Sequence, residues 1–214
     1  MPKYIMCYGD SNTYGYNPHT GFRFEENIRW TGRLAQLLGT EYKIIEEGLN
    51  GRTTCVTPPE EIFKNGMYCV EPCVRTHMPL DLMVIMLGSN DMKKTFGQTE
   101  EMIGTHMRQM IHKAKEVSAY KDMNGKPVRI LLVSPIYITK DILTGPFRDG
   151  FDEKSIAVSE GLADVYERIA EEEGCDFLNA ALFAAPGHLD GLHLEEEGHE
   201  QLALAMAEKI REIL

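Results

Sequence analysis

Two nearly continuous apolar runs restrict most strongly what this 214-residue chain can fold into. They occupy residues 81–87 and 129–133. Such runs are typical of strands that are covered on both faces, as in parallel sheets. With three similar shorter runs, they predict strands at residues 3–8, 42–46, 81–87, 129–134 and 175–178.

Amphipathic segments lie between these runs and predict helices at residues 27–38, 60–66, 99–118, 153–173 and 195–213. Thr99 is the expected N-cap of one helix, and Gly174 is expected to end another. Residues 56–80 and 135–151 are interpreted as long connections. The alternation predicts an α/β fold, a three-layer α/β/α sandwich around a five-stranded parallel sheet. We expect the flavodoxin-like strand order 2-1-3-4-5, in a single domain spanning residues 1–214.

The formal net charge of −11 limits the classes of partner. Nucleic acids and anionic membrane surfaces attract clustered Lys and Arg, so neither is expected as a partner. No stretch of 18 apolar residues predicts a membrane span. The first predicted strand begins near residue 3, which leaves no room for a signal peptide, so a cytoplasmic location is expected.

The five cysteines are scattered and odd in number, a pattern that favours reduced thiols over a disulfide framework. Cys69 and Cys73 are close in sequence, but no second close pair accompanies them. Because structural zinc takes four ligands, a metal site is not expected, and no other cofactor is predicted.

Polar segments follow the predicted strands. α/β proteins bind their ligands at the edge of the sheet where the parallel strands end. These segments are therefore expected to gather at one edge; they are Gly9-Asp10-Ser11-Asn12, residues 48–54, Gly88-Ser89-Asn90-Asp91, Ser134-Pro135-Ile136-Tyr137 and Asp190-Gly191-Leu192-His193.

The residue types in these segments suit acyl transfer. Ser11 supplies a hydroxyl, His193 a base for its proton, and Asp190 an acid that orients the imidazole. The amides of Ser11 and Gly51 and the side chain of Asn90 are the expected oxyanion donors. Each has an ordinary alternative: a helix cap for Ser11 and Asn90, a turn for Asp190 and Gly51, and a surface position for His193.

Further residues are candidates for lining the pocket or supporting the site from behind: Asp10, Asn12, Tyr14, Arg52 and Ser89. Asp10 and Asp91 could equally serve turns or caps. Arg52 could instead belong to an ion pair at an interface. Three more residues have open alternatives: Trp30 and Phe22 in a pocket, an interface or the core, and His77 at the pocket edge. His188 is a weaker candidate for the base, and the other histidines are interpreted as surface or packing residues.

In these residues the chain resembles the GDSL, or SGNH, hydrolase family. The four letters appear in order as Ser11, Gly51, Asn90 and His193, and Asp190 precedes the histidine by three residues. The matching blocks span residues 9 to 193. Asn12 stands in the place of the leucine that gives the GDSL motif its last letter.

Finer similarity, in residues 29–32, 46–54 and 80–88, is to the bacterial arylesterase/acyltransferase subgroup. There Gly51 stands in place of an alanine and Tyr14 in place of a tryptophan. The resemblance implies hydrolysis of small-molecule acetyl or short-acyl esters through an acyl-enzyme, without a metal. It also implies acyl transfer to alcohols and assembly into homo-oligomers. The loops at 16–26 and 136–151 match poorly, and they would shape the acyl and alcohol pockets.

Other functions remain open on the same triad: a carbohydrate or natural-product acetylesterase, or a lysophospholipase or thioesterase. From a different class, a flavodoxin-like module could hold an anion at the helix that begins near Ser11. Neither a P-loop lysine pattern nor Gly-x-Gly-x-x-Gly follows the first predicted strand, which weighs against that module.

Overall fold

Five parallel strands form the central sheet of the computed structural model, which describes residues 2–121 and 125–214. The strands are β1 (Lys3–Gly9), β2 (Tyr42–Gly48), β3 (Leu82–Met86), β4 (Arg129–Ser134) and β5 (Asp176–Asn179). Their order, β2-β1-β3-β4-β5, confirms the predicted one. Gly9 pairs with Gly48 on one side and Met86 on the other, so the carboxyl ends of three strands are level.

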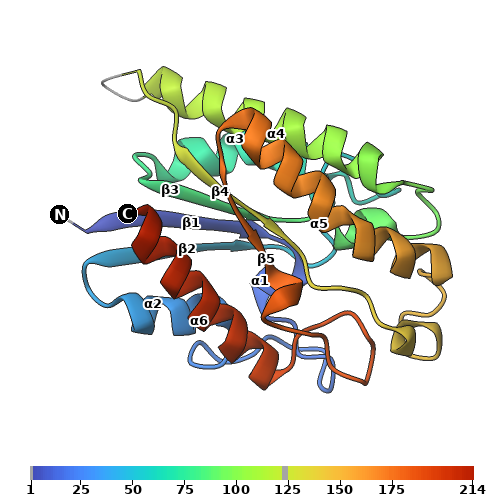
Figure 1. Ribbon diagram of the computed structural model, residues 1–214. Helices are drawn as coiled ribbons and strands as arrows, with labels where there is room; N and C mark the ends of the chain where they lie inside the picture. The colour runs from blue at the N-terminus through green and yellow to red at the C-terminus, as the bar shows by residue number, and fades with distance from the viewer. Residues whose placement is uncertain (1, 122–124) are drawn as a thin grey trace.

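Helices cover both faces of the sheet, which confirms the three-layer prediction (Figure 1). One face carries α3 (Gly66–His77), α4 (Glu100–Lys121) and α5 (Glu153–Glu173), and the other carries α2 (Trp30–Leu38) and α6 (Glu196–Ile213).

The strand side chains alternate between two buried clusters, because successive side chains of a strand point to opposite faces. On β1, Met6 and Tyr8 pack on the α3–α5 side, whereas Ile5 and Cys7 pack on the α2–α6 side. All four side chains are fully buried. The apolar runs of the sequence are thus explained by burial on both faces.

Helix α5 begins and ends at the predicted residues. Asp152 and Ser155 form a reciprocal capping box at its start, and Gly174 ends it with φ +61°. At the start of α4, Met102 N donates to Thr99 Oγ1 at 3.3 Å, which confirms the predicted cap. Short helices complete the chain: α1 (Ser11–Tyr14), η1 (Ile62–Lys64), η2 (Ser89–Met92), η3 (Lys140–Leu143) and η4 (Ala180–Leu182).

The predicted helix at 60–66 and the predicted connection at 56–80 are both wrong. A 3₁₀ turn, η1, occupies only residues 62–64, and α3 follows. Pro72 lies inside α3, where its ring removes a backbone donor and opposes helix formation. Packing overrides this local cost, because Val70 and Val74 are fully buried in the cluster on that face. Asn65 caps the helix by accepting from Met67 N at 2.9 Å.

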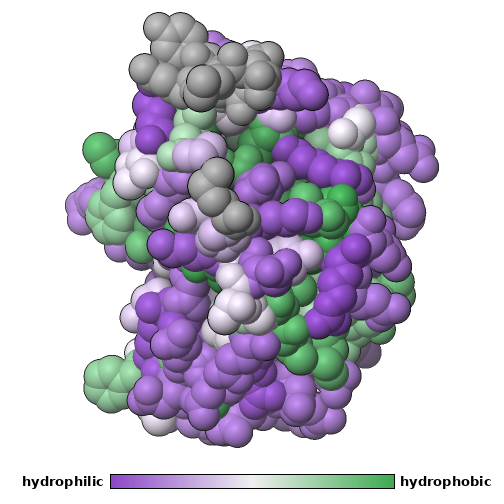
Figure 2. All heavy atoms as spheres, turned by 90° about the vertical axis from the view of Figure 1, so that its left-hand side faces the viewer, coloured by the Kyte–Doolittle hydropathy of each residue, from purple (hydrophilic) through white to green (hydrophobic). Residues whose placement is uncertain are grey.

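The strands begin on the left-hand side of Figure 1, and Figure 2 views that side directly. Hydrophilic residues cover most of it, with apolar residues in small patches. Within residues 2–121 and 125–214, no helix is both long and apolar enough to cross a bilayer. The carboxyl ends of the strands, which carry the polar segments, point to the opposite side.

Candidate active site

Ser11 is the first residue of α1 and follows β1 after a single connecting residue. That residue, Asp10, caps the helix by accepting from Asn12 N at 3.0 Å. Gly15 ends the helix after one turn with φ +83°. Ser11 is 7% exposed, so its hydroxyl is held at the carboxyl edge of the sheet with only a small part open to solvent.

His193 and Asp190 come back to this hydroxyl from the loop before α6. His193 Nε2 lies 2.9 Å from Ser11 Oγ, and His193 Nδ1 lies 2.6 Å from Asp190 Oδ2. The other carboxylate oxygen, Asp190 Oδ1, accepts from the backbone N–H groups of Leu192 and His193, each at 2.9 Å. A carboxylate beside Nδ1 favours the tautomer with the proton there, which leaves Nε2 free to accept the Ser11 proton.

Asp190 is fully buried. Burial raises the pKa of its carboxyl, but hydrogen bonds from the His193 side chain and from two backbone amides outweigh it, and the pKa lies below its ordinary value. The carboxylate therefore stays ionised beside the imidazole. The rings of Tyr16 and Phe147 lie against His193, with centroids 4.6 and 5.2 Å away. They cover the imidazole and limit access of water to it.

The three expected oxyanion donors belong to residues that line one cavity, Ser11, Gly51 and Asn90. Gly51 adopts φ +80°, a conformation that glycine accepts at no steric cost. Within the described part of the chain, neither Ser11 N nor Gly51 N has an acceptor. Asn90 Nδ2 donates one of its two hydrogens to Arg52 O at 3.2 Å, which leaves the second hydrogen available.

A cavity of about 210 Å³ opens over these groups. Tyr16 comes from the loop at 16–26, and Phe147 comes from the loop at 136–151, so these poorly matching loops do line it. The residues that line the cavity are Ser11, Tyr16, Asn50, Gly51, Lys64, Asn90, Lys93, Phe147, Phe151, Leu192 and His193.

Asn12 fastens the histidine loop to the helix that carries Ser11. Its side chain donates to Leu192 O at 3.2 Å and accepts from Leu194 N at 2.9 Å. These two backbone groups flank His193 on either side in the sequence. Asn12 is buried, so both bonds are shielded from water. The residue that replaces the leucine of the motif thus holds the backbone around His193 next to the helix that carries Ser11.

Replacing Asn12 by alanine is expected to lower kcat roughly tenfold or more while changing KM little, because small misplacements of reacting groups are costly. The unpaired Leu194 N–H would also lower the unfolding free energy by about 1–3 kcal/mol. Steady-state kinetics well below the variant's melting temperature measures the first effect. The control is Asn179→Ala, which removes another side-chain cap, that of Ala181 N, and should lower stability alone. An unchanged kcat in Asn12→Ala would contradict the positioning role.

Asp91 ties the segment after β3 to the loop after β2. Its carboxylate accepts from Thr54 N at 3.0 Å and from Thr54 Oγ1 at 2.5 Å. Burial raises the pKa of Asp91 to about 7 and that of Asp10 to about 6, despite the hydrogen bonds that each accepts. Both acids lie behind the site, and neither lines the cavity.

The stability of the protein should depend on pH through the ionisation of Asp91. Because its pKa is higher in the folded state, the stabilisation is complete below the ordinary value of 3.8 and is lost as the pH rises through about 7. Asp91→Asn removes this titration. The melting temperature of the wild type relative to the variant should therefore fall between about pH 4 and about pH 8. A difference that stays constant, or that widens with pH, would contradict this sign.

Other candidates from the sequence lie outside the cavity. Arg52 is buried, and its Nη1 donates to the backbone carbonyls of Gly9 and Glu47, so it braces the site from behind and forms no ion pair in the described chain. Tyr14 stacks under Arg23 instead of lining the cavity. Ser89 is buried at the start of η2 beside Asn90.

The remaining aromatic and histidine candidates also lie elsewhere. Trp30 is fully buried in the core, and Phe22 is 77% exposed. His77 Nε2 bonds to Glu47, and the exposed imidazole of His188 bonds to Asp141. Neither histidine reaches Ser11.

Sequence reasoning missed two cavity residues, Lys64 and Lys93, whereas Asn50 lies in the expected segment at 48–54. Lys93 follows Asn90 by three residues, and this proximity was a signal for it. Lys64 lies on η1, far from any motif, and reaches the site only through the fold. Its Nζ would be 3.2 Å from a Cβ built on Gly51.

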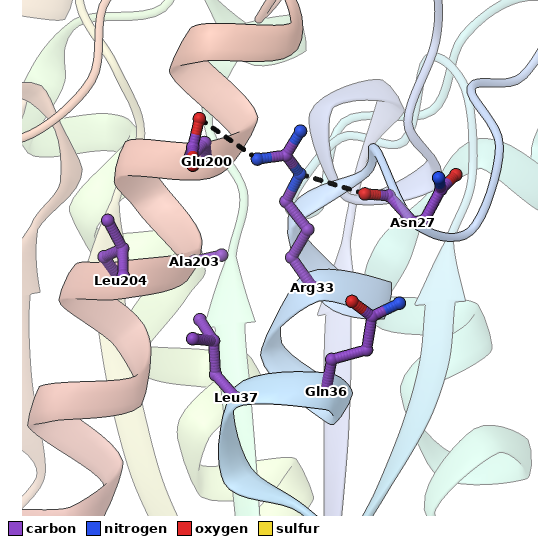
Figure 3. Close-up of a pocket in the computed structure, with 7 residues that line it drawn as sticks. All are labelled: Asn27, Arg33, Gln36, Leu37, Glu200, Ala203 and Leu204. Atoms are coloured by element: carbon purple, nitrogen blue, oxygen red, sulfur yellow. Dashed lines mark hydrogen bonds and ion pairs between the residues drawn. The ribbon is translucent and has the colours of Figure 1, made fainter.

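A second hollow, of about 280 Å³, lies between α2 and α6 (Figure 3). There Arg33 pairs with Glu200 at 3.2 Å, and its Nε donates to Asn27 O at 3.1 Å. None of the described residues that line it is a serine, cysteine or histidine, whereas the cavity over Ser11 adjoins the bonded series of Ser11, His193 and Asp190.

A serine, a histidine and an aspartate in hydrogen-bonded series at the carboxyl edge of a parallel sheet form the arrangement typical of serine hydrolases. A sequence model of the GDSL-like lipase/acylhydrolase family matches residues 7–201. The chain belongs to this family, and it is a carboxylic ester hydrolase. No curated protein matches the chain.

Solved structures agree over almost the whole length. The native aryl esterase of M. smegmatis is 35% identical, with 99% of this chain and 100% of that one covered and a TM-score of 0.92. A carbohydrate acetylesterase from Sinorhizobium meliloti is 30% identical, with the same coverages and a TM-score of 0.93. Another solved structure is 40% identical over 100% of this chain and 99% of that one, with a TM-score of 0.93.

Proposed function

We propose that this chain is a serine esterase that cleaves acetyl and other short-acyl esters through an acyl-enzyme, with the site in one domain spanning residues 1–214. Ser11 is the nucleophile, His193 the general base and Asp190 the residue that orients the base. The observation that carries the proposal is the unbroken series of contacts, 2.9 Å from Ser11 Oγ to Nε2 and 2.6 Å from Nδ1 to Asp190.

In the first half of the reaction, Ser11 Oγ attacks the ester carbonyl while its proton moves to His193 Nε2. The carbonyl oxygen becomes an oxyanion, and Ser11 N, Gly51 N and Asn90 Nδ2 donate hydrogen bonds to it. The C–O bond to the alcohol then breaks. His193 gives its proton to the departing alkoxide, and an acyl group remains on Ser11.

In the second half, water loses a proton to His193 and attacks the acyl carbon, which regenerates Ser11. An alcohol in place of water yields a new ester by the same steps. We propose that such transfer competes with hydrolysis, because Tyr16 and Phe147 cover the imidazole and keep its surroundings apolar. The cavity of about 210 Å³, which Phe151 also lines, favours short acyl chains over long ones.

An organophosphonate probe tests the nucleophile directly. Fluorophosphonate reacts with an activated serine hydroxyl, so the intact protein should gain one adduct, and peptide mapping should place it on Ser11. Pre-incubation with para-nitrophenyl acetate should slow the labelling, because the ester and the probe compete for the same hydroxyl. An adduct on any other residue, or no adduct at all, would contradict the assignment of Ser11 as the nucleophile.

A carbohydrate acetylesterase is the second candidate, favoured by the likeness to the acetylesterase of Sinorhizobium meliloti. A paired assay separates the two: acetylated sugars against aryl acetates at equal concentration. A kcat/KM that is tenfold higher or more on acetylated sugars would favour the second candidate. The reverse ratio would favour the aryl esterase.

A further inference from the structure

The charge inside the active-site cavity is opposite to that of the protein as a whole. The chain carries a formal net charge of −11, yet Lys64 and Lys93 line the cavity. None of the described residues that line it is Asp or Glu. Two cations are thus collected at the one place where substrate must bind.

Lys93 has no ion-pair partner in the described part of the chain. It is partly buried at the end of η2, three residues after Asn90. Burial and the charge of Lys64 lower the pKa of its ammonium group, and they outweigh the opposing effect of the carboxylates of Glu61, Asp10 and Asp91, none of which pairs with it directly. A partly desolvated ammonium group without a direct ion-pair partner is well placed to bind an anionic group of a ligand.

Lys64 lies beside Gly51, one of the proposed oxyanion donors. Its Nζ would be 3.2 Å from a Cβ built on that glycine. Its ammonium group pairs with Glu61 at 2.6 Å, and 22% of its side chain is exposed. This pairing holds Lys64 over the cavity and leaves two of its three hydrogens for other acceptors.

Balancing the acids behind the site does not account for these lysines. Asp10 and Asp91 are the buried carboxyls whose charges act on Lys93. Their hydrogen bonds come from Asn12 N and from Thr54, and neither forms an ion pair with a lysine in the described chain. Burial raises the pKa of both acids, so a smaller fraction of each is ionised and needs a cation nearby.

We propose that the esters this enzyme prefers carry a carboxylate, and that Lys93 and Lys64 bind it in the active-site cavity. This inference rests on the proposed function, because it names the substrate class of the same site. Lysine ammonium groups recognise carboxylates as point charges, so the carboxylate can belong to the acyl part or to the alcohol part of the ester. Matched esters distinguish the two.

The test compares kcat/KM for two pairs of esters. In the first, mono-para-nitrophenyl glutarate carries the carboxylate on its acyl part, and para-nitrophenyl pentanoate is its neutral match. In the second, para-acetoxybenzoate carries it on the alcohol part, and its methyl ester is the neutral match. The Ser11→Ala variant supplies the blank for uncatalysed hydrolysis. In at least one pair the anionic ester should be favoured by roughly tenfold at low salt.

Two further readouts link the preference to the lysines. The anionic-to-neutral ratio should fall towards one in Lys93→Met and in Lys64→Met, which keep most of the side-chain volume. It should stay at the wild-type value in Lys94→Met, which removes an exposed neighbouring charge outside the cavity. In the wild type, which needs no mutation, the ratio should shrink as ionic strength rises.

A wild-type ratio of one or below in both pairs would overturn the inference. So would a preference that survives both lysine substitutions. In either case, Ser11-dependent hydrolysis of the neutral esters would leave the proposed esterase function standing. Absence of Ser11-dependent hydrolysis with every ester would overturn the function and the inference together.

Discussion

Ser11→Ala is expected to lower kcat for para-nitrophenyl acetate by roughly a millionfold, the scale seen when the nucleophile of a serine triad is removed. Among the described residues that line the cavity, only Tyr16 carries another hydroxyl, and a phenol in its position does not replace the serine hydroxyl bonded to His193. Stopped assays with long incubation measure the residual rate, and thermal unfolding verifies that the variant is folded.

The matched control is Ser118→Ala. Ser118 is equally buried, but it bonds to Lys115 O and Val128 N beside the start of β4, at the opposite edge of the sheet. Its variant should lose stability and keep its kcat. If Ser11→Ala retained more than a hundredth of the wild-type kcat, the acyl-enzyme mechanism on Ser11 would be wrong.

Asp190→Asn is expected to lower kcat by about ten thousandfold, the effect known for this change in serine triads. The structure supplies the reason. The backbone amides of Leu192 and His193 require an acceptor, so the amide oxygen of the new side chain will face them. Its NH₂ group then faces His193 Nδ1, which must accept. The proton moves to Nε2, and Nε2 can no longer take the Ser11 proton.

Steady-state kinetics from acidic to alkaline pH measures this loss, and Asp141→Asn is the control. Asp141 also bonds to a histidine, His188 at 2.9 Å, but that pair is exposed and outside the cavity. The control should keep wild-type kcat. A loss in Asp190→Asn of less than tenfold would show that the carboxylate does not set the tautomer of the base.

Much of the fold could be predicted because its signals are local. The apolar runs mark strands buried on both faces, and Asp152, Ser155 and Gly174 set the ends of α5 through short-range hydrogen bonds and backbone conformation. Helix α3 could not be predicted in this way. Pro72 opposes it locally, and the burial of Val70 and Val74 that favours it depends on packing partners distant in sequence.

The residues of the candidate site also differ in whether a local sequence signal predicts them. Ser11, Asn90 and His193 belong to segments that follow strands or carry a motif, and the sheet edge brings them together. Lys64 has no such signal, because its position beside Gly51 depends on how the loop before α3 returns to the edge. The role of Asn12 was also hidden, since its partners are backbone groups about 180 residues away.

The two bonds of Asn12 have a consequence for motion. Ser11 and His193 come from opposite ends of the chain, yet Asn12, the residue next to Ser11, bonds to the backbone on both sides of His193. When the loop before α6 fluctuates, the imidazole and the hydroxyl are carried as one body. The loop that bears Phe147 makes neither bond, so the separation of Ser11 and His193 does not depend on its position.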